Sequence, residues 1–208
     1  PDDGLRKGAR VRQSTIDIAA KVLSITSQMG TKVELRSQDL RALQAAKERE
    51  KQQLKDQYDA VIEAFEDEIS KGTLKAVLQE DRLSVRLASQ DSFISGRADL
   101  TAQAKDLVGR LAETLSTAKG KIRVEGHTDN IPVMFSQNFK SNWDLSTARA
   151  SSVAAAMING SFIRQGRLKI AGFADSKPIG SNSTRLGRAM NRRIEIIVTA
   201  ATAEEARQ

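Results

Sequence analysis

The sequence contains no cysteine and a single histidine. A disulfide framework and a thiolate metal site are therefore excluded, and so is a metal site built from several histidines. Aromatic residues make up only 4% of the chain, so a hydrophobic core has to be built mainly from leucine, isoleucine, valine and alanine. At 208 residues the chain is long enough for one domain with an extension, or for two small domains.

Long apolar runs are also missing. The longest uninterrupted run, from Val153 to Ile158, has six residues, whereas a membrane-spanning helix needs roughly 18 to 20. No secretory signal pattern is present, and the first residue is Pro1 rather than methionine. We therefore expect a fragment or a processed product of a longer protein.

Net charge is distributed unevenly along the chain. Residues 1–80 contain 14 basic and 14 acidic side chains, whereas residues 81–208 contain 19 basic and 12 acidic ones, which accounts for the net charge of +7. Such an excess of positive charge has two interpretations. The chain is either an ordinary basic soluble protein, or it binds an anionic partner such as nucleic acid, a membrane surface or an acidic polymer. With one tryptophan and one tyrosine, the chain lacks the aromatic interleaving of single-strand binders, so we expect no nucleic-acid partner.

The first 72 residues have a helical pattern. Apolar spacing predicts helices over about 14–29 and 37–69, with Ser37 as the N-cap of the second. The middle of the second helix is charged on all sides, and a coiled coil would place Lys47 and Glu50 on its seam. A solvated helix that depends on a partner for stability is the preferred interpretation.

From about residue 73 the pattern changes to short strands and helices. Strands are predicted over 82–89, 121–126, 167–173 and 192–200, and helices over 101–118, 144–158 and 184–191. Asn142 or Asp144 is expected to cap the helix over 144–158, and Leu145 is expected to point into the core. This order, β-α-β-α-β-(α)-β, predicts an α/β two-layer sandwich over residues 73–208, preceded by a helical extension over residues 1–72.

A dense polar cluster follows the strand that ends at Gly126. Its members His127, Thr128, Asp129 and Asn130 lie where a rigid strand meets solvent, which is a common place for binding residues. Asp129 and Arg149, on the next helix, are predicted to face one groove. They form either a surface ion pair, worth about 0 to 1 kcal/mol, or a receptor for a zwitterion, in which the carboxylate meets an ammonium and the guanidinium meets a carboxylate.

No catalytic site is expected. His127 has no second histidine or cysteine to work with, so a structural role in which it hydrogen-bonds the loop is preferred over a catalytic triad. The segment "GSNSTRLG" lacks the lysine and the glycine spacing of a phosphate-binding loop. We therefore expect neither a cofactor nor a metal.

Four motifs occur in order: "VEGHTDNIPV", "SNWDLSTARASSV", "GFADSKPI" and "GRAMNRRIEI". Over about residues 80–200 they resemble the OmpA-like peptidoglycan-binding domain. The resemblance implies an OmpA-like fold in which Asp129 receives the ammonium, and Arg149 the carboxylate, of diaminopimelate in the wall peptide. The binding residues that it implies are Thr128, Asp129, Asn142, Leu145, Ser146, Arg149, Asn191, Arg192 and Arg193.

The segment from Asn130 to Val133, with "SNWDLS", resembles the MotB/PomB flagellar stator family. That resemblance implies a plug and linker over 1–72, a peptidoglycan-binding domain over 73–208, a homodimer, and a MotA/PomA-like stator A subunit as partner. It also implies a periplasmic location, with an inner-membrane helix that this chain lacks. A type VI secretion anchor has a similar "SNWDLS" and is the alternative, beside other OmpA-family wall tethers. A wall hydrolase is a further alternative, but no nucleophile–base pair supports it.

Overall fold

The computed structural model describes residues 3–90, 92–94, 96–118, 120–133, 138–160 and 163–201, and within the first helix it describes side chains from residue 20 onward, except 28 and 30–38. The elements of this part of the chain are α1 (Asp3–Ala64), α2 (Glu66–Ser70), β1 (Leu74–Leu78), β2 (Arg82–Ala88), α3 (Ala102–Thr114), η1 (Leu115–Thr117), β3 (Ile122–His127), α4 (Asn142–Asn159), η2 (Gln165–Arg167), β4 (Leu168–Gly172), α5 (Arg185–Asn191) and β5 (Arg193–Thr199).

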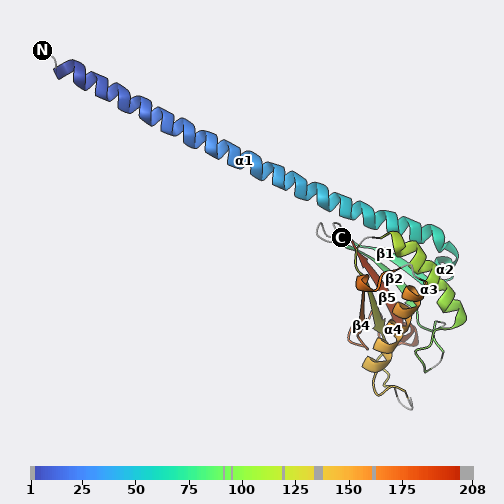
Figure 1. Ribbon diagram of the computed structural model, residues 1–208. Helices are drawn as coiled ribbons and strands as arrows, with labels where there is room; N and C mark the ends of the chain where they lie inside the picture. The colour runs from blue at the N-terminus through green and yellow to red at the C-terminus, as the bar shows by residue number, and fades with distance from the viewer. Residues whose placement is uncertain are drawn as a thin grey trace. The chain divides into compact units, whose positions relative to one another are not determined.

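A single helix, α1, replaces the two helices expected at the start of the chain (Figure 1). It continues through Gly30 and Ser37, so the prediction that Ser37 is an N-cap is wrong. A glycine inside a helix costs about 1 kcal/mol relative to alanine, which is too little to end a helix that continues on both sides of it. Among the described residues, no helix combines the length and the apolar character that a membrane crossing requires.

The chain divides into two compact units, residues 1–48 and 49–208. In the first unit the described apolar side chains of α1 are exposed, among them Leu23, Leu40 and Leu43. In the second unit Leu54, Val61 and Phe65 are at most 3% exposed and belong to the hydrophobic core. The second unit therefore begins well before the boundary expected at residue 73. The functional division into a linker and a binding domain stays a prediction.

A five-stranded sheet forms the centre of the second unit, in the order β1-β2-β5-β3-β4. Only β3 and β4 pair in parallel, and the other three pairs are antiparallel. Parallel strands need a crossover connection, and α4 lies in the crossover between β3 and β4. The α/β fold is confirmed, but β1 was not expected.

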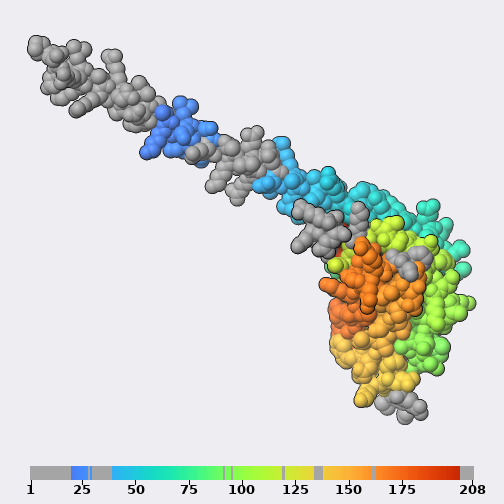
Figure 2. Space-filling model, in the orientation of Figure 1, coloured from blue at the N-terminus to red at the C-terminus, as the bar shows by residue number. Residues whose placement is uncertain are grey.

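One face of the sheet carries the core. Alternate residues of each strand point to this face, and α3 and α4 cover it (Figure 1). The fully buried strand residues on this face are Leu74, Leu83, Val85, Leu87, Ile122, Val124, Ile194, Ile196 and Val198, all at most 2% exposed. The C-terminal part of α1 lies beside α3, and so does α2 (Figure 2). At this contact the guanidinium of Arg110 packs over the ring of Phe65 and pairs with the carboxylate of Glu68.

The other face of the sheet carries charged side chains in cross-strand rows. One row runs from Lys75 through Arg86 and Glu195 to Glu125, on strands β1, β2, β5 and β3. The carboxylate of Glu195 accepts hydrogen bonds from Arg86 Nε (3.0 Å) and from Arg193 Nε (2.7 Å). These pairs neutralise charges that are partly or fully withdrawn from water.

Helix α4 approaches β3 and β4 very closely where these strands end. A Cβ atom placed on Gly126 would lie 2.0 Å from the backbone oxygen of Ser146, and one placed on Gly172 would lie 2.1 Å from Thr147 Oγ1. Both strand ends therefore require glycine. This contact fixes the start of α4 beside the polar cluster that follows β3.

Candidate functional site

A groove of about 450 Å³ is formed by the segments after β2 and β3, the first turns of α4, and Arg192. Its lining residues are Ser89, Gln90, Phe93, Gly96, Thr128, Asp129, Ile131, Pro132, Val133, Asn142, Leu145, Arg149 and Arg192. We call this the Asp129–Arg149 groove. Six of the nine residues expected to bind line it: Thr128, Asp129, Asn142, Leu145, Arg149 and Arg192.

The Asp129 carboxylate is held in place by two donors. Its Oδ1 accepts a hydrogen bond from the backbone N–H of Ile131 at 3.1 Å, and its Oδ2 accepts one from Arg192 Nη1 at 2.6 Å. Thr128 Oγ1 donates to the Asp129 carbonyl at 2.8 Å. Asp129 lines the groove but is only 6% exposed, so it is buried rather than at the exposed edge that its loop position suggested.

Asn142 holds the loop that follows β3. Its Nδ2 donates to the carbonyl oxygens of Ile131 (2.9 Å) and Asp129 (3.3 Å). The expectation that Asn142 or Asp144 caps α4 is wrong, because the N-cap is Ser141, whose Oγ accepts from the Asp144 backbone N–H at 3.2 Å. Asn142 therefore shapes the groove by fixing the backbone on either side of Asn130.

Ser146 connects α4 to the turn after β4. Its Oγ donates to the Trp143 carbonyl at 3.1 Å and accepts from the backbone N–H of Ala174, also at 3.1 Å. Ala174 has a positive φ of 46°, an unfavourable conformation for alanine that this hydrogen bond helps to hold. Ser146 is fully buried and does not line the groove, so it acts on the site through the backbone.

Leu145 is buried, at 8% exposed, but it lies in the wall of the groove and outside the main core cluster. Leu145 is therefore buried, as expected, but it packs in the groove and not in the main core cluster. Its side chain offers the groove an apolar surface between polar residues.

Arg149 is positioned by the segment after β2. Its Nε donates to the Arg97 carbonyl at 3.1 Å, its Nη1 donates to Ser89 Oγ at 3.2 Å, and its guanidinium lies 4.8 Å from the centre of the Phe93 ring. Burial lowers the pKa of Arg149, as does the nearby positive charge of Arg192, while Asp129 partly offsets these effects.

No carboxylate of the described residues forms an ion pair with Arg149. Asp129 pairs with Arg192 instead, so the interpretation of Asp129 and Arg149 as a simple surface ion pair is wrong. A partly desolvated guanidinium without a counter-charge beside a groove is suited to receive an anion.

Asn191 and Arg193 lie behind the groove and do not line it. Asn191 is fully buried, and its Oδ1 accepts from the backbone N–H groups of Ile179 (2.8 Å) and Gly180 (2.9 Å). Arg193 lies on the charged face of the sheet and pairs with Glu195. Of the three residues in the "NRR" segment, Arg192 is the one that lines the groove.

Sequence reasoning did not assign Ser89, Phe93 and Gly96 to the site, although all three line the groove. The segment "DSFISGRADL" carried a signal, namely an aromatic residue and a glycine in a loop. No sequence spacing connects this loop to Arg149, however, because the two meet only through the tertiary fold.

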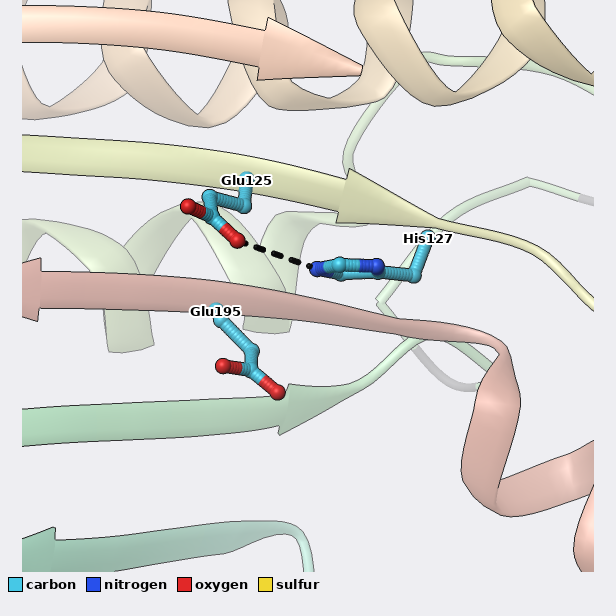
Figure 3. A group of neighbouring side chains, drawn as sticks. All are labelled: Glu125, His127 and Glu195. Carbon is cyan, nitrogen blue, oxygen red and sulfur yellow. Dashed lines mark ion pairs between the residues drawn. The ribbon is translucent and has the colours of Figure 1, made fainter. Parts of the chain in front are cut away.

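His127 belongs to a second polar group, with Glu125 and Glu195 (Figure 3). One ligand-type atom from each lies within 4.8 Å of the others, and His127 Nε2 is 3.4 Å from Glu125 Oε2. The expectation that His127 hydrogen-bonds the loop is wrong, because the ring is 2% exposed, stacks on Phe173, and neither nitrogen has a hydrogen-bond partner among the described residues.

Arginines compensate the two carboxylates of this group. Glu125 pairs with Arg123, and Glu195 pairs with Arg86 and Arg193. Burial raises the pKa of Glu125 and of Glu195, but contacts with His127 and Arg123 for the first, and with Arg193 and Arg86 for the second, outweigh it and lower both pKa values overall. A divalent cation would have to compete with three guanidinium groups, so we assign the group to the polar network of the sheet.

The model of the OmpA family matches residues 92–192. Protein YtxE of Bacillus subtilis (strain 168) is 33% identical over 147 residues, which cover 69% of this chain and 60% of that protein. Motility protein B of the same organism is 28% identical over 155 residues, which cover 74% of this chain and 58% of that protein. The chain thus spans somewhat less than two thirds of these two relatives.

Among solved structures, the cell wall anchor of the type VI secretion system from Pseudomonas aeruginosa is 33% identical. The superposition has a TM-score of 0.63 and covers 68% of this chain and 97% of that chain. The family match includes Asp129, Arg149 and Arg192, and the superposition extends over nearly the whole of the solved anchor. The chain therefore contains a domain of the OmpA family over residues 92–192.

Proposed function

We propose that this chain binds peptidoglycan without cleaving it and tethers a larger protein to the cell wall in the periplasm. The observation that carries the proposal is the partly buried guanidinium of Arg149, which forms no ion pair with a described residue and lies in one groove with the carboxylate of Asp129. A groove of about 450 Å³ is within the usual size range of a small-ligand site.

The chemistry of the groove fits the diaminopimelate residue of a wall stem peptide. The side-chain end of diaminopimelate carries an ammonium and a carboxylate on the same carbon. In our proposal the ammonium is bound by Asp129 and the carboxylate by the guanidinium fork of Arg149, with the methylene chain against Leu145. Thr128, Asn142 and Ser146 hold the backbone around this ligand through the hydrogen bonds described above.

A non-catalytic role is supported by the position of the His127 side chain. Its ring lies among Glu125 and Glu195 on the charged face of the sheet, as Figure 3 shows, and not among the residues that line the groove. Of the described residues, none offers Ser89 or Thr128 an imidazole base inside the groove. A hydrolase acting on the wall would need such a pair, or a metal ion.

The proposal further places the chain in a flagellar motor stator, which it would hold against the wall while ions flow through a membrane part. Similarity to motility protein B over 74% of the chain supports this role. We then expect a homodimer, a MotA/PomA-like stator A subunit, and an inner-membrane helix in the full-length protein. The exposed apolar residues of α1, among them Val22, Ile25, Leu40 and Leu43, offer surface for such contacts.

A second candidate is the wall anchor of a type VI secretion system. It is favoured by the higher identity, 33%, to the solved anchor from Pseudomonas aeruginosa, and by coverage of 97% of that chain. Both candidates use the same groove for the same ligand. They differ in the assembly that is held to the wall.

The ligand proposal is tested by calorimetry with a diaminopimelate-containing stem peptide and the matched lysine-containing peptide, which lacks the terminal carboxylate. Losing a charge-assisted pair costs about 1.5 to 3 kcal/mol, so binding of the lysine peptide should be weaker by roughly ten- to a hundredfold. Asp129→Asn keeps the shape and the Oδ1 acceptor but removes the charge, and it should weaken binding of both peptides. Equal affinity for the two peptides would remove Arg149 from the mechanism.

The assembly is tested by replacing the wall-binding part of a flagellar stator protein with residues 49–208 of this chain. Recovery of swimming in a strain that lacks its own stator would support the stator role. The same exchange in a type VI anchor, with secretion as the readout, tests the alternative. An Arg149→Ala copy of each chimera is the control, because it removes the proposed wall contact. Since this substitution also removes contacts to Ser89, Phe93 and Arg97, the cellular level of each copy is compared with that of its parent chimera.

A further inference from the structure

A second cavity, of about 370 Å³, adjoins the Asp129–Arg149 groove. Gln90 and Arg192 line both. The second cavity also contains residues from β1, β2 and β5 and from the segment before β5, among them Lys75, Arg86, Ile179 and Met190. We call it the Lys75 cavity.

The described lining of the Lys75 cavity is basic and contains no acidic residue. Four cations line it: Lys75, Arg86, Arg192 and Arg193. Two carboxylates pair with them, since Glu195 is shared by Arg86 and Arg193, and Asp129 pairs with Arg192. Four positive charges against two negative charges leave an excess of two at the cavity.

Lys75 and Arg86 are the source of this excess. They lie directly opposite each other on β1 and β2, in a register where like charges repel. Glu195 contacts only Arg86 of the two, and Lys75 forms no ion pair with a described residue. An anion in the cavity would relieve this repulsion and give Lys75 a partner.

Apolar side chains also line the cavity. Ile179 and Met190 line it and are 38% and 48% exposed, respectively. A lining that combines cations with aliphatic side chains favours a ligand in which a carboxylate is attached to a carbon bearing a small apolar group. Inorganic anions would use only the cationic half of this lining.

We propose that the Lys75 cavity binds a second carboxylate of the same wall peptide, that of a terminal alanine, while the Asp129–Arg149 groove holds the diaminopimelate residue. The inference rests on the proposed function and adds a specificity determinant to it. Arg192, shared by the two cavities, lies between the two ligand groups and is paired with Asp129. The alanine methyl group packs against Ile179 and Met190.

The test uses two synthetic stem peptides that both contain diaminopimelate and end in alanine, one with a free carboxylate and one with a carboxamide. Their affinities are measured for the parent chain, for Lys75→Gln, and for Lys105→Gln, an exposed lysine on α3 that lines neither cavity. Lys75→Gln is expected to weaken binding of the carboxylate peptide about three- to tenfold. It should leave binding of the carboxamide peptide unchanged, and Lys105→Gln should change neither.

The outcomes separate this inference from the function on which it rests. If Lys75→Gln changes the affinities of both peptides equally, or changes neither, the second carboxylate site is wrong while diaminopimelate binding stands. If the parent chain binds neither peptide, nor free diaminopimelate, the proposed function fails first. Thermal melts of both lysine variants should match that of the parent chain, because neither side chain is buried.

Discussion

The Nη1 atom of Arg192 lies 2.6 Å from Oδ2 of Asp129. The carboxylate proposed to receive the ligand's ammonium therefore already has a cation beside it, contributed by the residue just before β5. Arg192 is one third exposed and so can share or leave this contact at moderate cost. Hydrogen bonds from Ile131 and Arg192 keep the Asp129 carboxylate oriented in the free groove, while Arg149 forms no ion pair with a described residue. The groove thus has a counter-charge at its anionic end, and at its cationic end it has none among the described residues.

Arg149→Lys should separate charge from geometry at the cationic end. Lysine keeps the positive charge but loses the planar fork, which binds a carboxylate through two hydrogen bonds. We expect affinity for the diaminopimelate peptide to fall about tenfold, and Arg149→Ala to reduce it about a hundredfold. Calorimetric titration of the three proteins measures both effects, and full affinity in the lysine variant would show that charge alone suffices.

Arg149→Ala should also destabilise the fold, by about 1 to 2 kcal/mol. The reason is that Arg149 covers Phe93 and donates to Arg97 and Ser89. Ser89→Ala is the matched control, because it removes one of these contacts from outside α4. Chemical denaturation of both variants checks this, and a fully stable Arg149→Ala protein would mean that the segment after β2 does not need the arginine.

Much of the second unit was predictable from local pattern. Alternating apolar residues marked β2, β3, β4 and β5, and three- and four-residue spacing marked α3 and α4. The strand β1 was missed because "LKAVL" has too little alternation of apolar and polar residues to stand out. It is recognised as a strand only through its pairing with β2, which is a tertiary contact.

The site was predictable in its central residues and not in their partners. The resemblance to OmpA-like domains pointed to Asp129 and Arg149, because both belong to the motifs that carry it. The burial of Asp129, its pairing with Arg192 across 63 positions, and the support of Arg149 by Ser89 across 60 positions depend on the folded sheet. The same limit explains why Leu145 looked like a core residue: helical spacing cannot distinguish a core face from the wall of a groove.

Truncation should show where the folded unit begins. A protein covering residues 49–208 keeps Leu54, Val61 and Phe65 in the core and should melt like the full chain. A protein covering residues 73–208 loses these three side chains, at about 1.5 to 3 kcal/mol each, and should be strongly destabilised or unfolded. Thermal melts of the two fragments, beside the single variant Phe65→Ala, measure this. Equal stability of both fragments would place the start of the unit at residue 73 after all.

Gly126→Ala should disrupt the contact on which the groove depends. The added Cβ would lie 2.0 Å from the backbone oxygen of Ser146, so β3 and α4 would have to separate. We expect a loss of several kcal/mol and loss of peptide binding, because overpacking against backbone cannot be relieved by a side-chain rotation. Gly109→Ala is the matched control: its added Cβ meets no atom within 4 Å, and alanine should stabilise α3 by about 0.5 to 1 kcal/mol. Equal melting temperatures for the two variants would contradict the close approach of α4.

Acid should weaken the charged face of the sheet in a way that Glu195 controls. Contacts with Arg193 and Arg86 outweigh burial and lower the pKa of Glu195 below its ordinary value of 4.5. Its ionised form therefore stabilises the fold at pH values above about 4.5, and this contribution is lost as the pH falls through the lowered pKa.

Glu195→Gln should make the protein less stable at neutral pH, because Arg86 and Arg193 lose their counter-charge. The variant should also lose less stability than the parent between pH 5 and pH 3. Urea denaturation at a series of pH values measures both curves, and parallel curves would show that the Glu195 carboxylate gains nothing from its arginines in the folded state.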